Sequence, residues 1–97
     1  MRPVQLADIE MTARVLMQVP VERRVRLMQT LIGETECAEA YRLLHGAPHP
    51  QFGVGSLLSR AVRMQAAPRP AALEFDALDA YCAVVNALLA HQTHQTL

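Results

Sequence analysis

The chain has 97 residues, which suits a single domain. Hydrophobic residues make up 52% of it but aromatic residues only 4%, a balance that favours helices over strands. Its nine basic residues, all arginine, offset nine acidic ones, so the chain lacks the positive charge of a general nucleic-acid-binding protein. We see no apolar run of membrane-spanning length and no signal-peptide core at the N-terminus, so we expect a cytoplasmic protein without a membrane partner.

The first two helices are predicted on either side of Val19-Pro20. Apolar residues recur at helical spacing from about Leu6 to Gln18, and Pro20 suits the first position of the next helix. In the first helix we expect the core to be formed by Leu6, Ile9, Ala13, Leu16 and Met17. In the second we expect it to be formed by Val21, Val25, Met28 and Ile32.

The apolar pattern of the second helix changes phase at Gly33. After Gly33, the apolar positions lie about half a turn from the earlier stripe, at Cys37, Ala40, Tyr41 and Leu44. Either the helix kinks or restarts at Gly33, or one helix from Pro20 to His45 buries opposite faces at its two ends. We favour a kink or a short break, because glycine is a weak helix former.

The segment from His45 to Arg60 is rich in glycine and proline. Gly46 is predicted to end the second helix, and Ser56 to cap a third that runs to about Ala66. Free N–H groups at such a helix start attract anions, which makes a candidate anion site of His49, Gly53, Gly55, Ser56 and Arg60. The segment has neither the preceding strand nor the lysine of a phosphate-binding loop, so we favour an ordered structural corner.

The last helix is predicted to begin by Asp76, after the proline-broken stretch 66–72. Between residues 80 and 90 Asn86 is the one strongly polar side chain, a pattern typical of a helix buried on all sides. Either this helix is central to the bundle, or a second copy of the chain buries part of it. We expect Cys82 to pack in the core with Leu78, Val85 and Leu89, and residues 92–97 to fray.

The sequence has no pattern of catalytic residues, and we expect a protein that is not an enzyme and has no cofactor. His91 and His94 are spaced for one side of a helical turn, but a metal site usually needs three or four ligands. Cys37 lies among apolar neighbours, as a small buried hydrophobe does. The densest basic cluster is Arg23, Arg24 and Arg26, which could contact a phosphate backbone.

The stretch Tyr41–Leu57, followed by a proline-broken linker and by "DAYC" from Asp79, resembles a family of short alphaproteobacterial proteins. Members of that family carry a similar His-Pro-x-aromatic-Gly-x-Gly-Ser-Leu corner. The resemblance covers most of the chain. It implies no catalytic residue, and it implies that the corner is a structural signature.

Together these patterns predict one all-α domain over residues 1–97, a small irregular four-helix bundle. The chain has more apolar helix surface than we expect so short a protein to bury. We therefore predict a protein–protein interaction module with an adaptor or regulatory role. We expect it to form a homo-oligomer, with a dimer as the favoured state. The alternatives are a DNA-associated regulator that uses the arginine cluster, and a small-anion sensor at the Gly53–Ser56 helix start.

Overall fold

The computed structural model of the chain describes residues 1–96, with the side chains of residues 1–93. These residues form four helices: α1 (Leu6–Leu16), α2 (Val21–His45), α3 (Leu57–Ala61) and α4 (Phe75–Thr96). The described part of the chain has no strand, so the prediction of a small all-α bundle is confirmed. In the described residues, no helix combines the length and the apolar character that crossing a bilayer requires.

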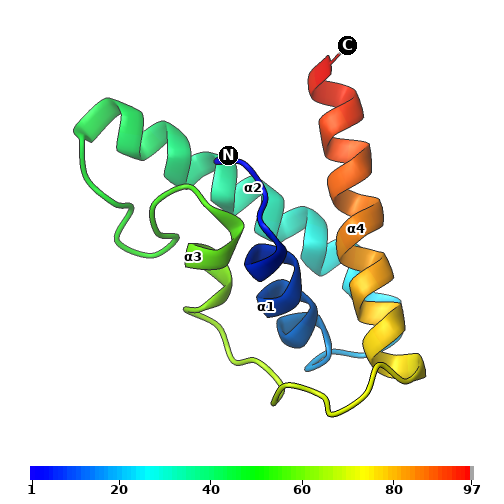
Figure 1. The fold of residues 1–97 in the computed structure, drawn as a ribbon. Helices are drawn as coiled ribbons and strands as arrows, with labels where there is room; N and C mark the ends of the chain where they lie inside the picture. The colour runs from blue at the N-terminus through cyan, green and yellow to red at the C-terminus, as the bar shows by residue number, and fades with distance from the viewer. Residues whose placement is uncertain (97) are drawn as a thin grey trace.

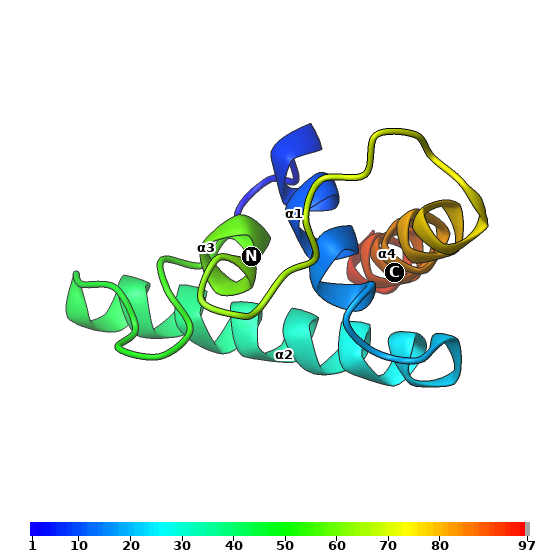
Figure 2. The same cartoon turned by 90° about the horizontal axis from the view of Figure 1, so that it is seen from below.

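The long helix α2 forms one side of the bundle. Figure 2 shows α1, α3 and α4 on the same side of α2, and α2 contacts all three. Helix α1 lies between α3 and α4 and contacts both (Figure 1). The core fills the space between the helices and includes Ala13, Leu16, Met28, Leu31, Leu57, Ala61, Ala80 and Val84.

Helix α2 is continuous through Gly33, so the predicted break is wrong. Its buried residues are Arg24, Met28, Leu31, Ile32, Thr35 and Ala38, most of them spaced alternately by three and four along a single face. The phase change in the sequence arose because the polar Arg24 and Thr35 occupy core positions. Val21 and Val25 are exposed instead, and so are Cys37, Ala40 and Leu44 from the predicted second face.

Helix α1 also buries polar residues in place of an expected apolar one. Leu6 is 86% exposed, whereas Asp8 and Thr12 are buried. The Thr12 hydroxyl donates to the carbonyl oxygen of Asp8 at 2.7 Å, which satisfies this polar group inside the helix. The helix ends at Leu16, two residues before the predicted end.

Helix α3 is short, and α4 is long but buried along one side. The Ser56 hydroxyl caps α3 by accepting from the Ser59 N–H, as predicted, but the helix ends at Ala61 rather than near Ala66. The alternative that α4 is central to the bundle is wrong, because its buried residues are Ala77, Ala80, Val84 and Leu88 on one side. The other alternative, that a second copy covers part of α4, stays a prediction. Helix α4 continues to Thr96 through the segment predicted to fray, and the side chains of residues 94–97 lie outside the described part.

Candidate interaction surface

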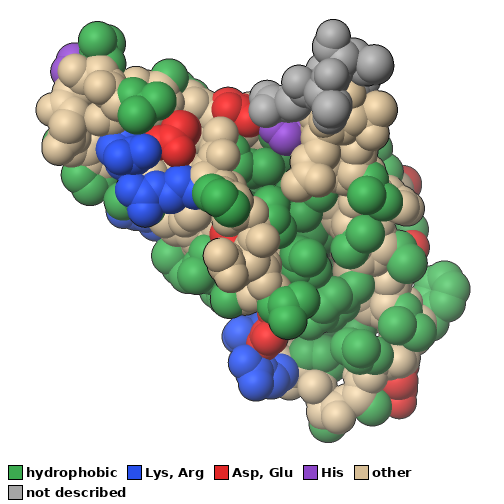
Figure 3. All heavy atoms as spheres, turned by 45° about the horizontal axis from the view of Figure 1, so that its top comes forward, with side chains coloured by type: hydrophobic (Ala, Val, Ile, Leu, Met, Phe, Trp, Pro, Cys, Tyr) green, Lys and Arg blue, Asp and Glu red, His purple; other side chains and the backbone are tan. Residues whose placement is uncertain are grey.

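The outward face of α4 is apolar and exposed. Five residues follow one another at intervals of three or four along this face, and we call them together the α4 stripe: Phe75, Leu78, Cys82, Val85 and Leu89. Their exposed fractions are 79% for Phe75, 48% for Leu78, 39% for Val85 and 59% for Leu89, and Cys82 is exposed as well. Figure 3 shows hydrophobic side chains gathered over the side of the molecule formed by α1 and α4.

The expectation that Cys82 packs in the core with Leu78, Val85 and Leu89 is therefore wrong. The four residues do share a helix face, but that face points to solvent. The core is formed by the opposite side of α4, where three of the four buried residues are Ala or Val, which fit close against α1 and α2. Most of the larger apolar side chains of α4, Leu88 excepted, are thus left outside.

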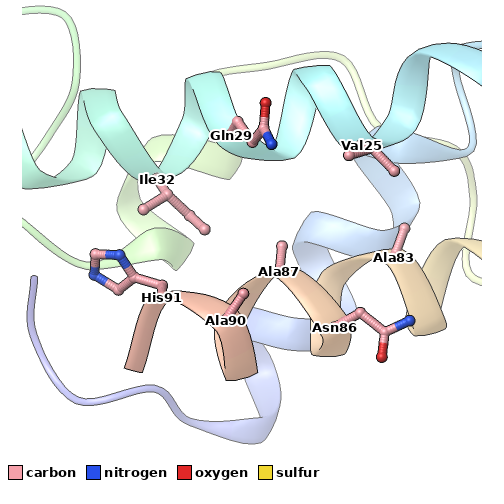
Figure 4. Close-up of a pocket in the computed structure, with 8 residues that line it drawn as sticks. All are labelled: Val25, Gln29, Ile32, Ala83, Asn86, Ala87, Ala90 and His91. Carbon is pink, nitrogen blue, oxygen red and sulfur yellow. The ribbon is translucent and has the colours of Figure 1, made fainter. Parts of the chain in front are cut away.

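A hollow of about 440 Å³ lies between α2 and α4, beside the α4 stripe. Figure 4 shows Val25 and Ile32 on the α2 wall, Ala83, Ala87 and Ala90 on the α4 wall, and Asn86 pointing away from α2. The groove exists because the two helices diverge (Figure 1) and alanines do not fill the gap. The alanines that line it add an apolar surface on the side of α4 that faces α2, next to the α4 stripe.

Ion pairs hold α2 and α4 together. Near their N-terminal ends Arg24 is 2% exposed and donates to Asp79 at 2.7 Å, to Asp76 and, from Nε, to the Leu16 carbonyl oxygen at 3.0 Å. Burial by itself would lower the pKa of Arg24, but the hydrogen bonds and charges of the two aspartates outweigh it and the pKa is raised. This arginine therefore joins the C-terminal end of α1 to the first turns of α4.

Arg24 is consequently unavailable to a phosphate backbone, and the predicted cluster of Arg23, Arg24 and Arg26 is divided. Arg23 and Arg26 are exposed. The arginine that would complete the cluster is buried against two carboxylates. The hypothesis that this cluster binds DNA thus loses Arg24, its central residue.

The predicted anion site is occupied by a carboxylate of the chain itself. Asp8 is 3% exposed, and its Oδ1 accepts from the Leu58 N–H at the start of α3 at 2.7 Å. Its Oδ2 accepts from the Gln5 N–H at 2.8 Å. Arg60, the expected source of positive charge, pairs with Glu34 at 2.8 Å. Sequence reasoning missed Asp8 as the ligand because it is 50 residues away from Leu58 along the chain.

The known families include one that matches nearly the whole chain. The model of "Domain of unknown function (DUF7742)" matches residues 2–88. The chain belongs to the DUF7742 family. No curated protein and no solved structure matches this DUF7742 chain.

The glycine-rich corner of this DUF7742 protein is built as a structural element. The Nδ1 of His49 accepts from the N–H groups of Gln51 and Phe52 at 3.0 Å each, and its ring stacks on Phe52 at 4.6 Å between centroids. Gly53 and Gly55 have positive φ angles of 93° and 96°. A Cβ at Gly55 would lie 2.9 Å from the Glu39 Cα of α2, so glycine permits the corner to pack against that helix.

The histidines of the DUF7742 chain do not assemble into a metal site in its described part. His91 Nε2 lies 2.7 Å from Glu36 Oε1, and the Met1 ammonium lies 3.0 Å from Glu36 Oε2. Burial alone would raise the pKa of Glu36, but the Met1 ammonium and His91 lower it below its ordinary value. The side chain of His94 lies outside the described residues. Among the described residues no group of three His, Cys, Asp or Glu is placed to hold a metal ion.

Proposed function

We propose that this DUF7742 protein is a non-enzymatic protein–protein interaction module that associates with itself and serves an adaptor or regulatory role. The observation that carries this proposal is the α4 stripe, a row of exposed apolar side chains along one helix face. Isolated exposed hydrophobic residues are normal, whereas a contiguous apolar patch of several hundred Å² marks an interaction site. Covering such a patch is favourable by roughly 25 cal/mol for each Å².

The proposal is tested by light scattering coupled to size-exclusion chromatography over a concentration series. We expect the measured mass to rise with concentration from that of the 10.7 kDa chain towards twice that value. The double variant Leu78→Gln/Leu89→Gln should remain a monomer. Both positions are exposed, so the variant should keep the helical circular dichroism of the parent.

The matched control is Leu43→Gln/Leu44→Gln, which removes two leucines near the end of α2 that are more exposed than Leu78 and Leu89. It lowers the surface hydrophobicity by at least as much as the Leu78→Gln/Leu89→Gln variant does but leaves the α4 stripe intact. We expect it to associate like the parent. A parent that stays monomeric at high concentration, or equal loss in both double variants, would contradict the proposal.

Two finer points accompany this function. The resemblance of Tyr41–Leu57 to short alphaproteobacterial proteins supports the corner as a structural signature of the family, which the Gly55→Ala variant described below tests. A cytoplasmic location is supported by Cys37 and Cys82, because two exposed free thiols suit a reducing compartment, whereas a bacterial origin is supported by the resemblance alone. Fractionation of source cells, with recovery of the protein outside the cytoplasm as the contrary result, tests the location.

A further inference from the structure

We propose that the α4 stripe pairs with the α4 stripe of a second copy, and that the two helices run antiparallel. This inference rests on the proposed self-association through the α4 stripe and adds the partner helix, its orientation and its register. Other exposed apolar side chains, such as Leu6 on α1 and Leu43 and Leu44 on α2, lie on other helices and do not extend the α4 stripe.

The spacing of the stripe favours another helix as the occupant. From Phe75 to Leu89 the intervals are three, four, three and four, which is the seam of a coiled coil. Such a seam keeps facing one partner helix because the side chains repeat every 3.5 residues. Gln92 is the next residue in the series and is also exposed. The seam thus runs through most of the 22 residues of α4.

The second copy is favoured because the four inner positions of the seam, Leu78, Cys82, Val85 and Leu89, carry similar side chains when its direction is reversed. The residues of the seam alternate between the a and d positions of a heptad. In an antiparallel pair, each layer of the interface joins an a position of one helix to a d position of the other. One register places Leu78 opposite Leu89 of the partner subunit and Cys82 opposite Val85 of the partner subunit. The same layers recur on the other side of the two-fold axis, and Phe75 lies opposite Gln92 of the partner subunit at each end. This register covers every residue of the α4 stripe.

The charges of α4 favour the antiparallel orientation. Glu74, Asp76 and Asp79 lie at its N-terminal end, and residues 80–90 carry no charged side chain. A parallel pair would bring the N-terminal ends of both α4 helices together, each with Glu74, Asp76 and Asp79 against the single buried Arg24, so the excess negative charges would repel. In the antiparallel register the two Glu74 residues lie roughly 28 Å apart along the axis, at 1.5 Å per residue.

The exposed area is sufficient for a specific dimer. The five side chains of the α4 stripe are each well exposed, and Phe75 is almost fully so. Two copies together present on the order of 1,000 Å², about the area that a biological interface needs. The small margin predicts a dimer that dissociates on dilution.

Disulfide formation between single-cysteine variants tests orientation and register. The parent for this experiment is the full chain with Cys37→Ser and Cys82→Ala, which leaves no other thiol and keeps an apolar side chain in the α4 stripe. Leu78→Cys and Leu89→Cys are prepared separately, one of them labelled with ¹⁵N, and are oxidised alone and as an equal mixture. We expect covalent dimer in the mixture, containing one chain of each kind, and none in either variant alone. Leu78 and its own copy would lie about 16 Å apart along the axis, too far for a disulfide.

The contrary outcomes are distinct. Covalent dimers in each variant alone would overturn the antiparallel orientation and indicate a parallel pair. A dimeric parent that gives no covalent product in any sample would overturn the α4 interface but leave self-association intact. The α4 stripe would then be free to bind a different protein. A monomeric parent at all concentrations would overturn the proposed function and this inference together.

Discussion

The inner face of α2 and the outward face of α4 contrast with each other. Polar residues occupy core positions on α2, where Arg24 and Thr35 are buried. Apolar residues occupy solvent positions on α4, where Phe75, Leu78 and Leu89 are exposed. Hydrophobicity therefore does not decide burial along either helix.

The difference between the two faces lies in the partners available to each residue. Every buried side-chain nitrogen and oxygen in the described residues has a hydrogen-bond partner, such as the Leu31 carbonyl oxygen for the Thr35 hydroxyl at 2.7 Å. Burial is tolerated because these bonds replace the lost contacts with water. The α4 stripe is not covered within the described chain, and for this reason we propose a second copy as its cover. The inner face of α2 serves folding, and the outward face of α4 is free for association.

The largest effect is expected at the buried arginine of α2. Arg24→Met should lower the free energy of unfolding by about 2–4 kcal/mol, because it leaves the buried Leu16 carbonyl oxygen without its donor. It also removes the charged hydrogen bonds to Asp76 and Asp79, whose side chains are 57% and 31% exposed and can be hydrated instead. Urea unfolding followed by circular dichroism at fixed protein concentration measures this loss. Arg23→Met, at the exposed neighbouring position, should change stability by less than about 0.5 kcal/mol. Equal effects at the two positions would mean that the buried arginine is not a joint between helices.

Asp8 tests the same principle on α1 with a smaller effect. Asp8→Ala removes the acceptor for two backbone N–H groups and should destabilise the fold by about 1–3 kcal/mol. Glu10→Ala is the control, since its ion pair with Arg69 is largely exposed and contributes about 0.5 kcal/mol or less. Thermal unfolding of both variants beside the parent measures the difference. An Asp8→Ala variant as stable as Glu10→Ala would contradict the capping role.

The sequence predicted the helices better than it predicted their faces. Helix formers, Pro20, Gly46 and the Ser56 cap are local signals, and they placed the four helices with errors of a few residues. Burial of Arg24 depends on Asp76 and Asp79, more than 50 residues along the chain, and no local pattern reveals that pairing. Without it, Val25 was a better core candidate than Arg24. The half-turn shift at Gly33 followed from this misplacement together with that of Thr35, which is also buried.

The candidate surface was partly readable from the sequence. An α4 apolar on all sides predicted either a central helix or a helix covered by a second copy, and the alternation of three and four from Phe75 to Leu89 is visible in the residues alone. The side of α4 that faces the core could not be read from the sequence, because Ala80 and Val84 are no more apolar than Leu78 and Leu89. The tertiary contacts with α1 and α2 select the side with smaller residues.

Gly33 tests whether α2 is one helix under no strain. Its φ is not positive, and a Cβ at this position would meet no atom within 4 Å. Gly33→Ala should therefore stabilise the protein by about 0.5–1 kcal/mol, as expected inside a continuous helix. Gly55→Ala is the matched contrast and should destabilise it by at least about 1 kcal/mol, since its φ is 96° and its Cβ would lie 2.9 Å from Glu39 Cα. Destabilisation by Gly33→Ala would indicate that α2 needs a bend.

The smallest effect concerns Glu36, which lies where the inner side of α2 meets α4. Its partners His91 and the Met1 ammonium lower the pKa of Glu36 below its ordinary value of 4.5, despite the opposing effect of burial. A carboxylate with a lowered pKa in the folded state stabilises the fold above the ordinary pKa, and this contribution is lost as the pH falls through the lowered value. The Glu36→Gln variant should accordingly be less stable than the parent by about 0.5 kcal/mol at neutral pH, a small figure because Glu36 is 34% exposed.

The two proteins should converge in stability once the pH has fallen below the lowered pKa of Glu36, because the parent carboxylate is then neutral like the glutamine. Unfolding curves of both proteins from neutral to strongly acidic pH provide the measurement. A difference that stays constant over this range would mean that glutamine disturbs packing at the edge of the α2–α4 groove rather than removing a charge. In that case the closure of the groove at Glu36 and His91 would depend on shape, and only Arg24 would join the two helices electrostatically.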